Sequence, residues 1–199
     1  MKPLAFASAA LAAVTALGAL PLHAQSTTRL RGTIVAVTPT TMSVKSREGR
    51  ELSVKLADDL GVSVTKAARF DEIKVGDVVG TTTRRSPNGD EVALEVHFLP
   101  ATARLGLSAW DLEPNSKMIN AAVRSKVVGT GDDELTLRVA DGEQRVIVPP
   151  NTPIVRSVPG TRADLVVGEA VFVSAQVGPD GALTAQRVLV GKDGVRPPQ

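Results

Sequence analysis

The chain has 199 residues, with 23 Lys and Arg against 21 Asp and Glu, and it has no cysteine. The formal net charge of +2 is small and the charges of both signs are interspersed. The composition therefore indicates no basic face that would draw nucleic acid or an anionic membrane to the chain. The lack of cysteine excludes disulfides, thiolate metal sites and a lipid-modified cysteine.

The first 24 residues have the pattern of a secretory signal peptide. Lys2 supplies a positive start, an uncharged run extends from Pro3 to Leu22, and the small residue Ala24 precedes Gln25. We therefore expect cleavage after Ala24. A secreted chain without cysteine is typical of a bacterial periplasm, so we expect a periplasmic protein. No later segment is apolar over the roughly 20 residues that a spanning helix needs, and the mature chain is expected to be soluble.

Two stretches of the remaining chain align with each other, first at an offset of 93 residues and then, after a one-residue shift, at 92. The aligned pairs include Arg31 with Arg124, Val35 with Val128, Met42 with Leu135, Val44 with Leu137, Gly49 with Gly142, Val54 with Val146, Gly76 with Gly168, Val79 with Val171, Ala93 with Ala185 and Val96 with Val188. A register held over this length predicts a tandem repeat.

Each copy has the pattern of a run of short strands. Apolar and polar residues alternate in Met42–Ser46 and in Glu51–Leu56, and Gly49 between them supplies the positive φ of a tight hairpin turn. Each copy contains about five such strands, with a long connection after the third. Closure into a barrel removes the exposed edges of a sheet this small.

We therefore expect an all-β protein of two tandem five- to six-stranded barrels, either OB-like (of the oligonucleotide- and oligosaccharide-binding type) or SH3-like. The expected organisation is a signal peptide (1–24), a first barrel (30–100), a linker (101–121), a second barrel (122–191) and a disordered tail (192–199).

Four motifs carry a resemblance to a known group of proteins: "DEIKVGDVV", "ADLVVGEAV", "DGALTAQRV" and the linker "AWDLEPNSKMIN". They resemble those of an uncharacterised family of bacterial exported domains with tandem OB-like barrel repeats. The resemblance covers most of the mature chain. It implies the fold and a periplasmic location, and it implies no particular activity.

The residues offer no catalytic constellation, so we do not expect an enzyme or a cofactor. His97 is the only histidine after the signal peptide, and no Gly-x-Ser-x-Gly stretch is present. Neighbouring carboxylates such as Asp58 and Asp59 point to opposite faces of a strand. One histidine and no cysteine do not supply a metal site. The strands also lack the aromatic series on which single-stranded nucleic acid stacks.

The linker contains Trp110, the only tryptophan of the chain. One interpretation is that Trp110 is a structural wedge that fixes the two barrels. The other is that Trp110, Asp111, Asn115 and Asn120 line a cleft between the barrels that binds a ligand or a partner. The sequence thus favours a non-catalytic binding or scaffold protein that contacts a protein or an envelope component. The alternative is an accessory protein for a small polar ligand or a metal ion, with its site at the linker.

Overall fold

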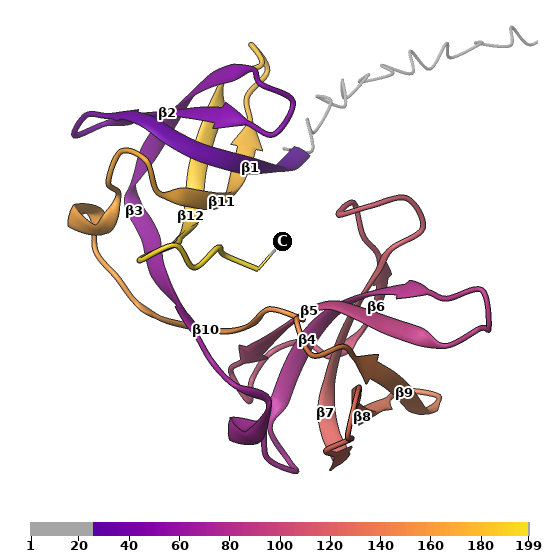
Figure 1. Cartoon of the computed structure of the whole chain (residues 1–199). Helices are drawn as coiled ribbons and strands as arrows, with labels where there is room; N and C mark the ends of the chain where they lie inside the picture. The colour runs from indigo at the N-terminus through magenta and orange to yellow at the C-terminus, as the bar shows by residue number, and fades with distance from the viewer. Residues whose placement is uncertain (1–25, 199) are drawn as a thin grey trace, which may run out of the picture.

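A computed structural model describes residues 26–198, which form an all-β protein (Figure 1). The predicted signal peptide lies outside the described residues. Within residues 26–198 the only helices are two 3-10 turns, η1 (Phe70–Glu72) and η2 (Arg162–Asp164). The strands are β1 (Ser26–Val37), β2 (Thr41–Ser46), β3 (Glu51–Ala67), β4 (Val78–Arg85), β5 (Glu91–Leu99), β6 (Gly106–Ala109), β7 (Lys117–Val127), β8 (Asp133–Val139), β9 (Gly142–Val148), β10 (Ile154–Pro159), β11 (Ala170–Val177) and β12 (Leu183–Val190).

Strands from the two ends of the chain form a closed five-stranded barrel, which we call the first barrel. β1 pairs with β2, β2 with β3, β3 with β12, β12 with β11, and β11 returns to β1. The pairing of β3 with β12 is parallel and the other four are antiparallel. In Figure 1 this barrel is the upper lobe, where indigo strands lie beside yellow ones.

Strands from the middle of the chain form the lower lobe, which we call the second ring. β7 pairs with β8, β8 with β9, β5 with β4, and β4 with β7. A short parallel pairing of β9 with β5, at Glu91 opposite Val146, completes the ring. The short strand β6 pairs antiparallel with the first residues of β7, from Ala109 opposite Lys117 to Gly106 opposite Asn120.

This grouping differs from the expected order of consecutive barrels. The strands of residues 30–100 are divided, because β1–β3 lie in the first barrel and β4–β5 in the second ring. The later strands are divided the other way round, because β7–β9 lie in the second ring and β11–β12 in the first barrel. Each lobe therefore combines the beginning of one aligned stretch with the end of the other, an exchange of the kind seen in domain swapping.

The physical basis of the exchange is the length of β3. The alternation in the sequence predicts that this strand ends at Leu56, but it continues to Ala67 and leaves the first barrel. Its last residues pair antiparallel with β10, which runs back the other way. Thr65 lies directly opposite Ser157 in this pairing, and the two residues also correspond at the offset of 92. The connections that would otherwise be irregular thus gain backbone hydrogen bonds to each other.

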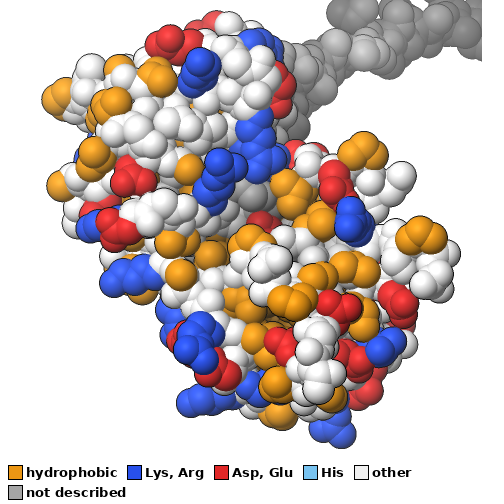
Figure 2. Space-filling view, in the orientation of Figure 1, with side chains coloured by type: hydrophobic (Ala, Val, Ile, Leu, Met, Phe, Trp, Pro, Cys, Tyr) orange, Lys and Arg blue, Asp and Glu red, His pale blue; other side chains and the backbone are white. Residues whose placement is uncertain are grey.

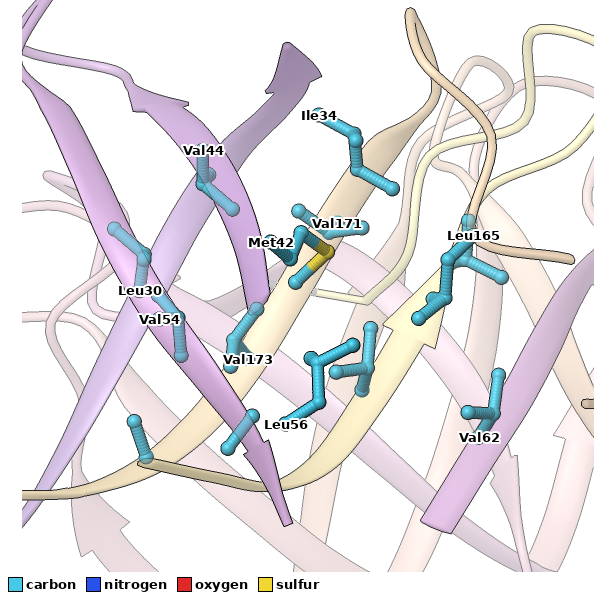
Figure 3. Packing of buried hydrophobic residues seen from close by; sticks show 14 of the residues in the cluster. Leu30, Ile34, Met42, Val44, Val54, Leu56, Val62, Leu165, Val171 and Val173 are labelled. Atoms are coloured by element: carbon cyan, nitrogen blue, oxygen red, sulfur yellow. The ribbon is translucent and has the colours of Figure 1, made fainter. Parts of the chain in front are cut away.

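Each lobe has its own apolar core (Figure 3 shows that of the first barrel). The first core includes Leu30, Ile34, Met42, Val44, Val54, Leu56, Leu165, Val171, Val173, Ala185 and Val188. The second core includes Ile73, Val79, Ala93, Val96, Ile119, Val123, Leu135, Leu137, Val146 and Val148. Residues that align in the sequence, such as Met42 and Leu135, occupy the same places in the two cores and are both fully buried.

The alignment of the first strands is shifted by four residues in the structure. The backbone N–H of Gly168 donates to the carbonyl of Ile34 at 2.9 Å, and that of Gly76 donates to the carbonyl of Val123 at 2.9 Å. Ile34 therefore corresponds to Val123, whereas the sequence alignment places it on Val127. The hairpin of β7 and β8 is four residues longer than that of β1 and β2, because Val123 pairs with Leu137 whereas Ile34 pairs with Val44. A single-offset comparison does not detect a change in hairpin length.

The structure describes the segment after β12, part of the tail predicted over 192–199, up to Pro198. Gly194 adopts a positive φ of 81°. The resulting turn lets the Val195 N–H donate to the carbonyl of Lys192 at 3.0 Å. Pro197 is buried, and the segment lies between the two lobes in Figure 1.

The exchange predicts which engineered disulfide forms. Thr33 lies directly opposite Ala170 across β1 and β11, within the Cα separation that a disulfide spans. We expect the pair Thr33→Cys and Ala170→Cys to oxidise within one chain, as measured by mobility on a non-reducing gel and by peptide mapping. Because the chain has no cysteine, no native thiol competes.

The matched control is the pair Thr33→Cys and Val78→Cys, which would be neighbours if the barrels were consecutive. Val78 belongs to β4 in the other lobe, so this pair is expected to stay reduced. Oxidation of the control pair and not of the first pair would contradict the exchange.

Candidate functional site

A cleft of about 550 Å³ lies where the two lobes meet β3 and β10, which we call the crossing strands. The first barrel contributes side chains of β11 and β12, the second ring contributes β5 and β7, and Ser63 and Ser157 come from the crossing strands. The lining residues are Ser63, His97, Phe98, Leu99, Pro100, Ser108, Trp110, Met118, Asn120, Ser157, Phe172, Arg187, Leu189 and Pro198. A concave, mostly apolar site with a few polar groups between two lobes is a common arrangement for ligand binding.

The polar part of the cleft is a row of three residues across β5, β4 and β7. His97 lies opposite Gly80, and Gly80 lies opposite Asn120. Directly opposite residues share one face of a sheet, so the two side chains flank the glycine. A Cβ at Gly80 would overlap the His97 imidazole at Nε2 and would lie 2.8 Å from Asn120 Oδ1. The absence of a side chain at position 80 is what lets the imidazole and the amide come together.

Two atoms of this row are buried without a hydrogen-bond partner among the described residues, Nδ1 of His97 and Oδ1 of Asn120. An unpaired buried polar atom costs about 1–3 kcal/mol. Burial also lowers the pKa of His97 from 6.5 to about 4. The imidazole is therefore neutral at physiological pH and offers one donor and one acceptor.

The corresponding row of the first barrel has different chemistry. Leu189 lies opposite Phe172, and Phe172 lies opposite Arg31. Phe172 fills the position that Gly80 leaves empty, and the Arg31 guanidinium lies 5.2 Å from the centre of the Phe172 ring. The second ring therefore contributes the polar pair His97 and Asn120 to the cleft, and at the corresponding row the first barrel contributes the apolar Phe172 and Leu189, with the charged Arg187 nearby on β12.

Trp110 connects the two lobes at the side of the cleft. It follows β6 in the second ring, and the guanidinium of Arg29, on β1 of the first barrel, lies 4.0 Å from its ring centre. This contact has the geometry of a cation–π interaction. Trp110 thus bridges the lobes and also lines the cleft, so the two interpretations of this residue are compatible.

Asp111 lies outside the cleft and makes the second contact between the linker and β1. Its Oδ1 accepts a hydrogen bond from Arg31 Nη2 at 2.7 Å and lies 3.8 Å from Arg29 Nη1. The hydrogen bond from Arg31 is the main reason that the pKa of Asp111 lies below its usual value. Asp111 therefore fixes the loop to the first barrel.

Asn115 also lies outside the cleft, in the turn that closes the loop. It is exposed and adopts a φ of 63°, a left-handed conformation that Asn tolerates better than most residues. The neighbouring Ser116 is buried, and its hydroxyl donates to the carbonyl of Trp110 at 3.1 Å. Of the four residues singled out from the sequence, the structure thus brings Trp110 and Asn120 into the cleft, and places Asp111 and Asn115 beside it.

Sequence reasoning missed Gly80, Phe172, Arg187 and Leu189 as parts of the site. A signal for some of them is present in the alignment, because His97 aligns with Leu189 and Gly80 aligns with Phe172. A polar and an apolar residue at corresponding positions indicate that the two stretches differ in function there. The sequence does not show that these positions face each other, since that depends on the exchange of strands.

Within residues 26–198, no group of three or more His, Cys, Asp or Glu side chains lies close enough to hold a metal ion. No helix in that range has the length and apolar character needed to cross a bilayer. Comparison with models of protein families, with curated proteins and with solved structures found no match to this chain.

The environment of His97 predicts a pH dependence of stability. Its pKa is about 4 in the folded protein and near 6.5 when unfolded. Its contribution is therefore complete above about pH 6.5 and declines as the pH falls towards 4. Between about pH 7 and pH 5 we expect the parent protein to lose roughly 1–2 kcal/mol of unfolding free energy from this residue.

The matched variant is His97→Leu, which installs the residue found at position 189. Urea unfolding at both pH values, followed by Trp110 emission, measures the difference. The carboxylates make the same contribution to the pH dependence of both proteins, so the difference between the two proteins reports His97. The unfolding free energy of the variant should therefore fall less than that of the parent between the two pH values. An identical loss in the two proteins would show that His97 titrates normally.

Proposed function

We propose that this chain is an exported, non-catalytic binding protein of the periplasm that holds a small ligand in the cleft between its lobes. The observation that carries the proposal is the pair of buried, unpaired atoms that belong to two residues lining the cleft, His97 Nδ1 and Asn120 Oδ1. A ligand that bonds to both removes a cost that the free protein bears. The export signal in the sequence supports the periplasmic part of the proposal.

The surroundings of these atoms define the chemistry of the ligand. Leu99 and Met118 come from β5 and β7, the strands that carry His97 and Asn120, while Phe172, Leu189 and Arg187 come from the first barrel. The neutral imidazole and the amide suit an uncharged hydroxyl or amide group. The proposed ligand is therefore a small molecule with an aliphatic or aromatic body and one such polar group.

We further propose that the chain arose by duplication and that both lobes are OB-like barrels with exchanged halves. The order of pairing supports this, because in each lobe the first three strands of one stretch close against the last two of the other. The third and fifth positions pair in parallel in both lobes. A five-stranded ring with a long third connection resembles the OB fold more than the SH3 fold.

The non-catalytic part of the proposal depends on the same residues. His97 is the only histidine after the signal peptide, and its lowered pKa makes it a weak base. The expectation of a protein or envelope partner stays a prediction, since the cleft is the feature with ligand-like geometry.

Substitution of Gly80 tests the proposal. Gly80→Ala places a Cβ where the imidazole lies, so we expect His97 and Asn120 to separate and ligand binding to be lost. The overpacking should cost about 1–3 kcal/mol of unfolding free energy. The measurement is a screen of small hydroxy and amide compounds by melting temperature and by the emission of Trp110, which lines the cleft.

Gly61→Ala is the matched control, because the nearest atom to a Cβ there is 3.7 Å away. A compound that stabilises the parent and Gly61→Ala, and not Gly80→Ala, supports the cleft as the binding site. The proposal fails if no compound in the screen binds, or if every compound that binds the parent binds Gly80→Ala equally well.

A further inference from the structure

A second hollow, of about 480 Å³, lies on the first barrel beside the linker loop. It is bounded by β1, by the turn between β2 and β3, and by Asp111 and Leu112 of the loop. Its charged lining residues are Arg29, Arg31, Arg47, Arg50, Glu48 and Asp111. None of these charged side chains lines the cleft, so the two sites have separate binding groups.

Arg31 is the buried group of this hollow. Its side chain is only 9% exposed, although it carries a full charge. Its Nη2 donates to Asp111, while its Nε is buried and has no hydrogen-bond partner among the described residues. Burial removes the guanidinium from water, and the unpaired N–H leaves part of that desolvation cost without a compensating hydrogen bond.

The positive charges of the hollow exceed the negative ones. Four arginines face two carboxylates, and Asp111 serves both Arg29 and Arg31. The pKa of Arg47 lies below its usual value because of burial and because Arg31 and Arg196 repel its charge, and the attraction of Glu95 and Glu48 offsets part of this effect. Figure 2 shows Lys and Arg side chains, in blue, on the upper lobe next to its junction with the lower one. Arg29 and Arg31 thus share the single carboxylate of Asp111.

We propose that this hollow binds a tetrahedral oxyanion, a phosphate or sulfate group, with Arg31 as the buried anchor and Arg29 and Arg50 at the exposed side. Guanidinium groups bind such anions through parallel N–H donors in a planar fork. Glu48 also lines the hollow and opposes an anion on that side. Binding supplies a further acceptor to Arg31 and a second negative group to the two arginines that share Asp111.

Titration with inorganic phosphate and sulfate tests the site, with sodium chloride at matched ionic strength as the reference. Phosphate should raise the melting temperature above the chloride value and change the emission of Trp110, because the ring lies 4.0 Å from the Arg29 guanidinium. Arg50→Gln and Arg31→Lys should each weaken phosphate binding about tenfold or more, the effect of losing one charge-assisted hydrogen bond. Arg31→Lys keeps the charge that pairs with Asp111 and removes the fork.

Arg138→Gln is the control, since Arg138 is exposed on β8 of the other lobe and its loss changes the net charge equally. If Arg31→Lys does not fold by circular dichroism, the comparison of Arg50→Gln with Arg138→Gln decides. The proposal is overturned if phosphate acts no differently from chloride, or if Arg138→Gln weakens binding as much as Arg50→Gln. Gly80→Ala should bind phosphate normally, which separates this result from the proposal about the cleft.

Vesicles of phosphatidylcholine with and without phosphatidylglycerol identify the source of the oxyanion. Binding only to the vesicles with phosphatidylglycerol, with competition by free phosphate, assigns the site to a phosphoryl headgroup. Binding of free phosphate without vesicle binding assigns it to a soluble anion. Both results support the site, and vesicle binding that Arg50→Gln leaves unchanged counts against it.

Discussion

Between the two lobes, β3 and β10 run antiparallel and pair from Val155 opposite Ala67 to Pro159 opposite Ser63. This pairing carries the chain from one lobe to the other and back again. It satisfies the backbone of two connections that would otherwise lie unpaired between the lobes. Because Thr65 faces Ser157, the residue at the corresponding position, the pairing has the local symmetry of a two-fold axis.

The position of the cleft follows from that pairing. Ser63 and Ser157 come from the crossing strands themselves. The outer faces of β5 and β12, which hold corresponding positions in the two lobes, contribute His97 and Leu189 to the same cleft. The residues at these positions differ, because His97 is polar and Leu189 is apolar. A symmetric framework therefore encloses an asymmetric site.

The linker and the last residues of the described chain complete the junction. Trp110 packs against Arg29, and Asp111 accepts a hydrogen bond from Arg31. These two contacts attach the loop after β6, in the second ring, to β1 of the first barrel. Pro198 reaches the cleft from the C-terminal side. These contacts restrict the relative motion of lobes that are already tied by β3 and β10, which favours a preformed site over one that closes on its ligand.

Much of the fold can be predicted from the sequence. The alternation in Met42–Ser46 and the glycine turn at Gly49 correspond to β2 and its hairpin, and aligned residues such as Met42 and Leu135 are core residues of their lobes. The partners of the strands cannot be predicted in this way, because the corresponding strands present nearly the same apolar pattern and either set completes a core.

The candidate site is predictable to a smaller extent for the same reason. Trp110 and Asn120 both lie in the predicted linker (101–121), and both line the cleft. The pair formed by His97 and Gly80 depends on the cross-strand register of β4 and β5, and the facing wall depends on the exchange. A pattern along the chain contains neither piece of information.

Each lobe needs strands from both halves of the chain. A specific protease site inserted between Thr102 and Ala103, in the exposed connection before β6, tests it most directly. After cleavage, native mass spectrometry and gel filtration should find both fragments in one particle with the mass and elution of the uncut protein. Two fragments that separate without denaturant, each folded by circular dichroism, would contradict the exchange and the cleft that depends on it.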